Sequence, residues 1–427
     1  MEQLNEYFHN NNLDDDLQSA YRKFHSTETA LMKIVNDILV DIDNHKCVFL
    51  ALLDLSAAFD TCDISVFLRR LRIGHGISGT ALDWITSYLT DRSQRVTIDG
   101  DFSNPIDLEC GFPQGSKIGP QFYKRYTKPL SLVIMDIVRR HFYADDSQLH
   151  TSAGVSSAPE QTEAIGYLES AIRDVSSWMF SNKLKLNTDK TEFLILRSKY
   201  RVNSISIKSV CVGNDIIDES KSAKNLGVHI DNELSFERHV ISICKACYMQ
   251  IAAIWKIRKC IDENTAKILV NALVVSKLDY FNGLLYGLPN YLVHKLQMVL
   301  NSAARLVTLT PKSNHITPIL RKLHWLPVSA RIDYKILVIV YKCLNGTAPK
   351  YLRAMLQLYS PTRTLRSKSK HLLIEPSFIQ VTYGSRAFSV AAPKLWNKLP
   401  FHIRQCATLQ QFKKHLKTFL FKRSYCE

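Results

Sequence analysis

His141-Phe142-Tyr143-Ala144-Asp145-Asp146-Ser147-Gln148-Leu149-His150 is the stretch that decides the fold expected for this chain. Apolar and aromatic residues lead into two adjacent aspartates, and a polar segment leads out. This pattern predicts two short strands that meet in a tight turn, with Asp145 and Asp146 at its tip. Neighbouring carboxylates repel each other unless a cation lies between them. A solvated Asp-Asp turn is the simpler interpretation of the dipeptide by itself, so a catalytic interpretation requires a third carboxylate here.

A continuous apolar segment at residues 47–54, Cys-Val-Phe-Leu-Ala-Leu-Leu-Asp, offers that third carboxylate. Such a run is typical of a strand buried on both faces, and Asp54 emerges at its C-terminal end, where sites lie in sheet-based enzymes. If the hairpin with Asp145 and Asp146 pairs beside this strand, three carboxylates meet at one end of a sheet. Carboxylate oxygens suit Mg²⁺ or Mn²⁺, and two such ions stabilise both oxygens of a phosphoryl transfer. A nuclease could use the same three residues.

A loop with several glycines around a proline lies between these two segments: Gly111-Phe112-Pro113-Gln114-Gly115-Ser116-Lys117-Ile118-Gly119-Pro120. Its composition predicts a backbone that can approach a ligand closely, with Gln114 as a planar donor and acceptor. An ordinary turn before the next helix is the simpler alternative.

Hydrophobic periodicity predicts a mixed chain that becomes largely helical after Ser235. The stretch from Leu55 to Asp60 is expected to turn into a helix that ends near Leu71. Further helices are predicted at about 26–42, 80–90, 120–138, 160–181, 235–259, 263–278, 290–307 and 329–345, and further strands at 94–98, 193–196, 204–208 and 225–230.

The net charge of +16 is unevenly distributed. Residues 1–250 hold 27 Lys and Arg against 33 Asp and Glu, whereas residues 251–427 hold 28 against 6. Such an excess over a long segment indicates a polyanionic partner for the C-terminal part, either nucleic acid or an anionic membrane surface, and a merely solvated basic face is the alternative. No uninterrupted apolar run approaches the roughly 18 residues of a spanning helix. The N-terminus lacks the features of a secretion signal, so we expect an intracellular protein without a membrane.

Taken in order, these motifs resemble the reverse transcriptases of LINE-type (non-LTR) retrotransposons, particularly the jockey-like group, from about Gln18 to near the C-terminus. The matching segments are Phe49–Thr61, Gly111–Ser116, Tyr143–Asp146, Trp178–Glu192, Leu226–Val228 with Asp231, Leu234, Phe236 and His239, Trp325–Val328, and Leu395–Pro400.

The resemblance implies a role for each matching residue. Asp54, Asp145 and Asp146 would be the catalytic residues that hold two Mg²⁺ (or Mn²⁺) ions, and Lys190 would donate a proton to pyrophosphate. Phe59 would be the bulky residue that leaves no room for a 2′-hydroxyl. The nucleotide-binding residues would be Leu55, Phe59, Pro113, Gln114 and Gly115.

Some features depart from the family pattern. No endonuclease domain precedes the polymerase part, and the upstream finger segments are missing, so the resemblance suggests a truncated copy whose endonuclease and fingers a partner would supply. Lys117 and Gln121 stand where apolar residues are usual, so the helix after the loop is expected to pack poorly.

Two functions therefore remain open. The first is an RNA-directed DNA polymerase that adds deoxynucleotides to a primer 3′-hydroxyl on an RNA template. The second is an inactive remnant that binds nucleic acid through its basic C-terminal part. Localisation would be nuclear or cytoplasmic. The fold class implied is α/β (α+β): partial fingers at 1–46, a right-hand polymerase palm at 47–232, a helical thumb-like region at 233–310 and a basic helical C-terminal region at 311–427.

Overall fold

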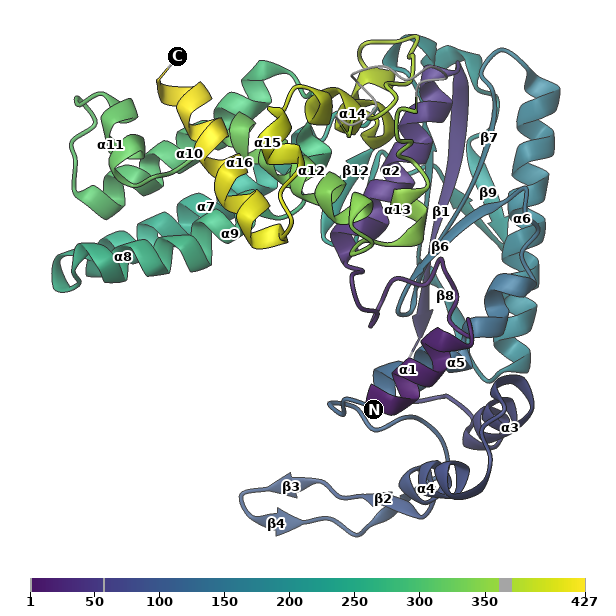
Figure 1. The fold of residues 1–427 in the computed structure, drawn as a ribbon. Helices are drawn as coiled ribbons and strands as arrows, with labels where there is room; N and C mark the ends of the chain where they lie inside the picture. The colour runs from purple at the N-terminus through teal and green to yellow at the C-terminus, as the bar shows by residue number, and fades with distance from the viewer. Residues whose placement is uncertain (1, 57, 361–370, 427) are drawn as a thin grey trace. The chain divides into compact units, whose positions relative to one another are not determined.

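The computed structural model describes residues 2–56, 58–360 and 371–426 of this chain (Figure 1). They form two compact units. The first comprises residues 1–27, 47–195 and 201–220, and the second comprises residues 28–46, 196–200 and 221–427. The predicted boundaries at residues 46, 232 and 310 stay a prediction, since these units group the chain by contacts alone.

A four-stranded sheet is the centre of the first unit, with the strand order β6-β7-β1-β8. Its strands are β1 (Lys46–Ser56), β6 (Arg139–Tyr143), β7 (Asp146–Gly154) and β8 (Lys185–Leu196). Strands β6 and β7 pair antiparallel, and Tyr143 faces Asp146 across the turn. The predicted hairpin and the predicted strand at 47–54 are therefore confirmed.

Helix α6 (Ala158–Ser181) packs against β7 and follows the predicted helix at 160–181. The Ser157 side chain caps its first turn by accepting a hydrogen bond from Glu160 N. Leu168, Ile172 and Val175 share its buried face and are fully excluded from solvent. This contact gives the sheet a solid apolar backing.

The remaining elements of the first unit are shorter. They are α1 (Glu2–Asn10), α3 (Ile64–His75), α4 (Gly79–Leu89), β2 (Arg92–Gln94), β3 (Thr97–Ile98), β4 (Asp101–Phe102), β5 (Ile106–Leu108), α5 (Gly119–Tyr126), the 3₁₀ helix η1 (Lys128–Leu132), β9 (Ser209–Val212) and β10 (Asp215–Asp218). The 3₁₀ helix η2 (Lys199–Ser204) has residues in both units.

Two predicted helices differ from the structure. The helix expected to follow Asp60 begins at Ile64, because the Asp63 side chain accepts a hydrogen bond from Val66 N and caps the helix there. Ala57, in the same stretch, lies outside the described residues. The helix expected at 120–138 ends at Tyr126, and the 3₁₀ helix η1 with Pro129 follows it.

The strand predictions near residues 204–230 were also displaced. No strand covers residues 204–208 in the described chain, and a hairpin of β9 and β10 follows instead. In the second unit, β11 (Ser222–Asn225) and β12 (Val228–Asp231) form a hairpin in place of one strand at 225–230. Leu226 and Gly227 make its turn, both with positive φ.

The second unit is largely helical. Besides β11 and β12 it contains α2 (Thr27–Asp43), α7 (Glu237–Ile257), η3 (Arg258–Cys260), α8 (Glu263–Val270), the π-helix η4 (Asn271–Val275), α9 (Ser276–Asp279), η5 (Asn282–Leu285), α10 (Asn290–Thr308), α11 (Ile316–Lys322), α12 (Val328–Leu344), α13 (Lys350–Arg353), η7 (Gly384–Arg386), α14 (Phe388–Asn397), α15 (Phe401–Arg404) and α16 (Leu409–Tyr425). Part of the predicted basic region, residues 361–370, lies outside the described chain.

One helix of the described chain, Glu237–Cys260, is long and apolar enough to cross a membrane by length and composition alone. Ser, His, Cys and Lys residues interrupt its apolar sequence, so a search for uninterrupted runs missed it. A single such helix is weak evidence for a membrane. Helix α7 packs against α10 and buries Val240, Ile243 and Cys247. Together the sheet and helices confirm the predicted α+β class.

Candidate active site

Asp54 lies near the C-terminal end of β1, and Asp145 and Asp146 lie at the turn between β6 and β7. The order of the sheet makes β7 the direct neighbour of β1. The Cys47 thiol donates to Ala153 O at 3.5 Å, which fixes one point of this pairing. Asp54 follows Cys47 by seven positions along β1, and Asp146 precedes Ala153 by seven positions along β7. Antiparallel neighbours in this register bring Asp54 beside Asp146.

The electrostatics of the three carboxylates reflect this placement. Burial raises the pKa of Asp146 to about 6, and the charges of Asp145 and Asp54 add to this effect. The pKa of Asp145 is also raised, first by burial and then by the charge of Asp54. This end of the sheet therefore carries a concentration of negative charge that a cation would relieve.

Lys190 supplies one positive charge to this end of the sheet. Its Nζ lies 3.3 Å from Asp54 Oδ2, and its side chain is 68% exposed. It reaches Asp54 from β8, the strand beside β1. The predicted proton donor is thus brought to the predicted metal ligand. An exposed lysine in a single ion pair is held only weakly.

The donor set fits a hard divalent cation. Three carboxylates offer oxygen ligands, and Asp54 Oδ2 is buried and carries the ion pair with the exposed Lys190. Within the same described part of the chain, no three His, Cys, Asp or Glu side chains already converge in a geometry that would hold a metal ion. The structure therefore gathers the three carboxylates at one end of the sheet, and ion binding would require their side chains to draw closer.

Phe59 stacks on Tyr123 of α5, with ring centroids 4.4 Å apart and an interplanar angle of 24°. Tyr123 is fully buried, so it gives Phe59 a rigid support. The sequence did not single out Tyr123, although its place among the buried aromatic residues of α5 was a signal.

The side chain of Leu55 is buried and lines a small cavity of about 10 Å³, enough for about one water molecule. Tyr123, Ala144 and Asp145 line the same cavity. The Leu55 side chain thus lies next to the hairpin turn. Its predicted contact with a nucleotide would have to come from its backbone.

The loop with the predicted nucleotide-binding residues is joined to the segment after β1. Gln114 Nε2 donates to Asp60 Oδ1 at 2.6 Å, and Phe112 N donates to Phe59 O at 2.9 Å. Pro113 O accepts a hydrogen bond from Ser116 Oγ. Gly115 is exposed and has a φ of +75°, with open space where a side chain would point. The structure therefore brings Phe59, Pro113, Gln114 and Gly115 into one connected segment.

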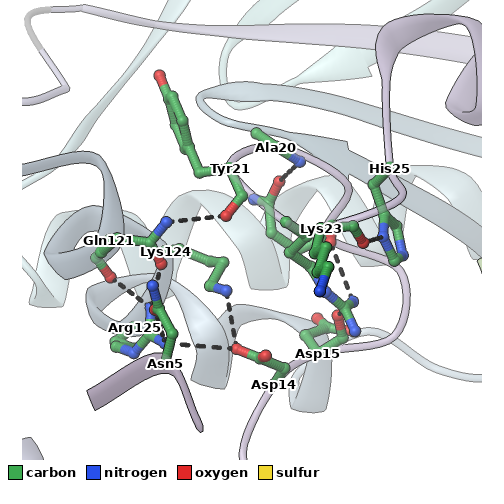
Figure 2. Close-up of polar contacts among 12 residues, drawn as sticks. Asn5, Asp14, Asp15, Ala20, Tyr21, Lys23, His25, Gln121, Lys124 and Arg125 are labelled. Carbon is green, nitrogen blue, oxygen red and sulfur yellow. Dashed lines mark hydrogen bonds and ion pairs between the residues drawn. The ribbon is translucent and has the colours of Figure 1, made fainter. Parts of the chain in front are cut away.

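The expectation that α5 packs poorly was wrong. Gln121 Nε2 donates to Tyr21 O at 2.8 Å, and Gln121 Oε1 accepts from Arg125, as Figure 2 shows. Lys124 lies 2.8 Å from Asp14 in an ion pair buried beneath the N-terminal segment. Lys117 is exposed and precedes the helix. Polar residues on α5 therefore bind the N-terminal segment, while its aromatic residues Phe122, Tyr123 and Tyr126 are fully buried.

Comparison with known proteins identifies similar sequences. The family model described as "Reverse transcriptase (RNA-dependent DNA polymerase)" matches residues 1–230. The "Probable RNA-directed DNA polymerase from transposon BS" of Drosophila melanogaster is 25% identical over 321 residues, which is 72% of this chain and 34% of that protein. The "RNA-directed DNA polymerase from mobile element jockey" of the same species is 25% identical over 241 residues, 55% of this chain and 25% of that protein.

This chain therefore spans about a third of the length of the first relative and a quarter of the second. Among solved structures, telomerase from Candida albicans in complex with a fragment of telomeric RNA aligns with a TM-score of 0.36 and 10% identity, covering 74% of this chain and 53% of that one. Apo telomerase from Candida tropicalis aligns with a TM-score of 0.41 and 11% identity, covering 83% and 58%. Both scores are too low to define the fold.

Proposed function

Since this chain belongs to the reverse transcriptase (RNA-dependent DNA polymerase) family, whose model matches more than half of it, we propose that it extends a DNA primer on an RNA template. The resemblance to the reverse transcriptases of jockey-like elements is confirmed by these relatives. Members of the family are nucleotidyltransferases that generally depend on a divalent metal. The observation that carries the proposal is the shared negative charge of Asp54, Asp145 and Asp146 at one end of the sheet.

We assign these three residues as the ligands of two Mg²⁺ or Mn²⁺ ions. When bound, the two ions would stabilise the attacking and the leaving oxygen of nucleotidyl transfer. The three carboxylates that would hold the ions come from β1 and from the turn before its neighbour β7. In this proposal the backbone therefore needs little rearrangement when the ions bind. Lys190 is exposed and next to Asp54, and in this proposal it donates a proton to an oxygen of the departing pyrophosphate.

The nucleotide pocket in this proposal is formed by the segment after β1 and the loop bonded to it. Phe59, held by its stack on Tyr123, excludes a 2′-hydroxyl and so favours deoxynucleoside triphosphates. Gln114 and Gly115 border the base and sugar, and the open space at Gly115 admits close approach by a ligand. The backbone of Leu55 and Pro113 completes the wall.

The nucleic-acid partners follow from charge. Acidic residues are rare after residue 250, and three of them are occupied: Glu263 with Lys322, Asp279 with Arg331, and Asp333 with Arg423. The 28 lysines and arginines of this part outnumber its 6 acidic residues, and this excess of positive charge favours phosphate groups as partners. We propose an RNA template and a DNA primer as partners, and a nuclear or cytoplasmic place of action.

Incorporation of a single nucleotide tests this function. The full chain, with a primer annealed to an RNA template and Mg²⁺ or Mn²⁺, should add the complementary deoxynucleotide and reject the ribonucleotide. Phe59→Val should lower this preference by at least about tenfold, because one contact that excludes the hydroxyl is lost. Failure of the parent chain to extend any primer, with nucleic-acid binding retained, would favour the inactive remnant.

A further inference from the structure

The turn that carries Asp145 has an unusual backbone. Tyr143 and Asp146 face each other across β6 and β7, so Ala144 and Asp145 are the two residues of the turn. Ala144 has a φ of +56°, in the left-handed region that residues other than glycine rarely adopt. A tight turn of this kind prefers glycine at this position, so alanine keeps the conformation at a cost that some other contact must offset.

Gln18 makes that contact. Its Oε1 accepts a hydrogen bond from Ala144 N at 3.0 Å, and its Nε2 donates to Ala144 O at 3.2 Å. Both backbone groups of the turn residue are therefore bound by one side chain, which is 4% exposed. The same Oε1 also accepts from Ala20 N at 3.0 Å, which fixes the orientation of the carboxamide.

The backbone on both sides of Gln18 is held against β6. Phe142 N donates to Leu17 O, and Ser19 N donates to Phe142 O, both at 2.9 Å. The Ser19 hydroxyl lies 2.9 Å from His141 Nε2. These bonds fix the backbone of Gln18 next to β6, the strand that leads into the turn, so its carboxamide lies at Ala144. This contact joins residues that are 126 positions apart in the sequence.

We propose that Gln18 is a positioning residue for the active site: it fixes the peptide groups of Ala144 so that the Asp145 carboxylate stays where a divalent cation needs it. Gln18 touches neither metal nor substrate and acts through the turn. This inference rests on the proposed function for its catalytic consequence. Its structural consequence, the fixed turn and its affinity for a cation, can be measured on a chain that does not polymerise.

The test compares Gln18→Ala with Ser19→Ala in the full chain. Both residues lie in the same buried segment, but the Ser19 hydroxyl bonds His141 on β6 whereas Gln18 bonds Ala144 in the turn, so Ser19→Ala is the matched control for a general loosening of the segment. A second variant, Ala144→Gly, is combined with Gln18→Ala, because glycine adopts a positive φ without strain. Three readouts are used: hydrogen exchange at the Ala144 amide, Mn²⁺ affinity by electron paramagnetic resonance, and kcat and KM for nucleotide incorporation.

We expect Gln18→Ala to speed exchange at the Ala144 amide, to weaken Mn²⁺ binding about tenfold and to lower kcat, with KM for the primer–template unchanged. Ala144→Gly should recover part of the loss in the double variant. Equal effects of Ser19→Ala, or no effect of Gln18→Ala on Mn²⁺ affinity, would overturn the proposal. If the parent binds Mn²⁺ and Gln18→Ala weakens it but neither chain extends a primer, the polymerase function fails and the role of Gln18 stands.

Discussion

Lys190 Nζ lies 3.3 Å from Asp54 Oδ2, so a lysine on β8 covers the carboxylate at the end of β1. A residue assigned to proton donation thus also supplies positive charge beside the three carboxylates before any substrate arrives. A metal ion that binds Asp54 would have to bind beside the Lys190 ammonium group or displace it. Because the lysine is largely exposed, the cost of displacing it is modest.

The first prediction follows from that competition. Lys190→Gln should tighten Mn²⁺ binding to the substrate-free chain by about threefold to tenfold, because a neighbouring positive charge is removed. Electron paramagnetic resonance titration measures the change. Lys185→Gln, an exposed lysine on the same strand, is the control and should leave the affinity as it is. Weaker binding in Lys190→Gln would show that the lysine supports the cation site.

The second prediction concerns pH. Burial and its acidic neighbours raise the pKa of Asp146 from 3.8 to about 6, so the folded chain holds this proton more tightly than the unfolded chain. The contribution of Asp146 to the free energy of unfolding therefore falls as the pH rises from about 4 to about 6, and then stays constant. Without metal, Asp146→Asn should be more stable than the parent at pH 7.5 by about 1–2 kcal/mol, with solvent screening allowed for.

That advantage should shrink as the pH falls below about 6 and disappear below about pH 3, where the carboxyl group is protonated in both states. Calorimetric melting of the two chains in chelator at pH 4.5, 6 and 7.5 measures it. A difference that stays the same at all three pH values would contradict the assigned environment of Asp146.

The third prediction compares two glycines of one loop. Gly111 has a φ of +82°, and an added Cβ would lie 2.7 Å from Asp60 O, a backbone atom that cannot easily move. Gly115 has a φ of +75° but open space around it. Gly111→Ala should lower the free energy of unfolding by about 2–4 kcal/mol, and Gly115→Ala by about 1 kcal/mol. Urea unfolding measures both, and equal losses would contradict the packing of the loop on Asp60.

The fourth prediction concerns the buried charges shown in Figure 2. Asp14 lies 2.8 Å from Lys124 and 3.7 Å from Arg125, whose side chains are 5% and 1% exposed. Asp14→Asn leaves both cations buried without a carboxylate, so we expect a loss of about 3 kcal/mol in the free energy of unfolding.

Asp16→Asn is the control for Asp14→Asn, because the Asp16 side chain is 55% exposed and pairs with Arg22 at 3.7 Å. It should change stability by less than about 1 kcal/mol. Comparable losses in the two variants, measured by chemical unfolding, would mean that burial of the Asp14 pair contributes little.

Local sequence patterns predicted the sheet and its acidic turn well. The apolar run before Asp54 and the aromatic lead into Asp145 each depend on neighbouring residues, so periodicity and turn chemistry suffice to place them. The start of α3 was placed too early, because the capping contact of Asp63 competes with the helical pattern of the residues before it. The turn between β11 and β12 was missed for a similar reason: Leu226 adopts a positive φ that its residue type does not suggest.

Contacts between distant parts of the chain could not be predicted. The bonds from Gln18 to Ala144 and from Gln121 to Tyr21 depend on the folded arrangement of the N-terminal segment. Gln121 illustrates the error: its polarity suggested a poorly packed helix, whereas it meets a backbone carbonyl that needs a donor. Polar residues in otherwise apolar patterns are most informative when their partners are known.

The most direct test of the central claim is the rate of RNA-templated nucleotide incorporation in three chains: the parent, Asp145→Asn and Asp54→Asn. If carboxylates from two neighbouring strands form one catalytic centre, each substitution should lower the rate by at least about a thousandfold, with folding and primer–template binding retained. Incorporation at the parental rate by either variant would contradict the account.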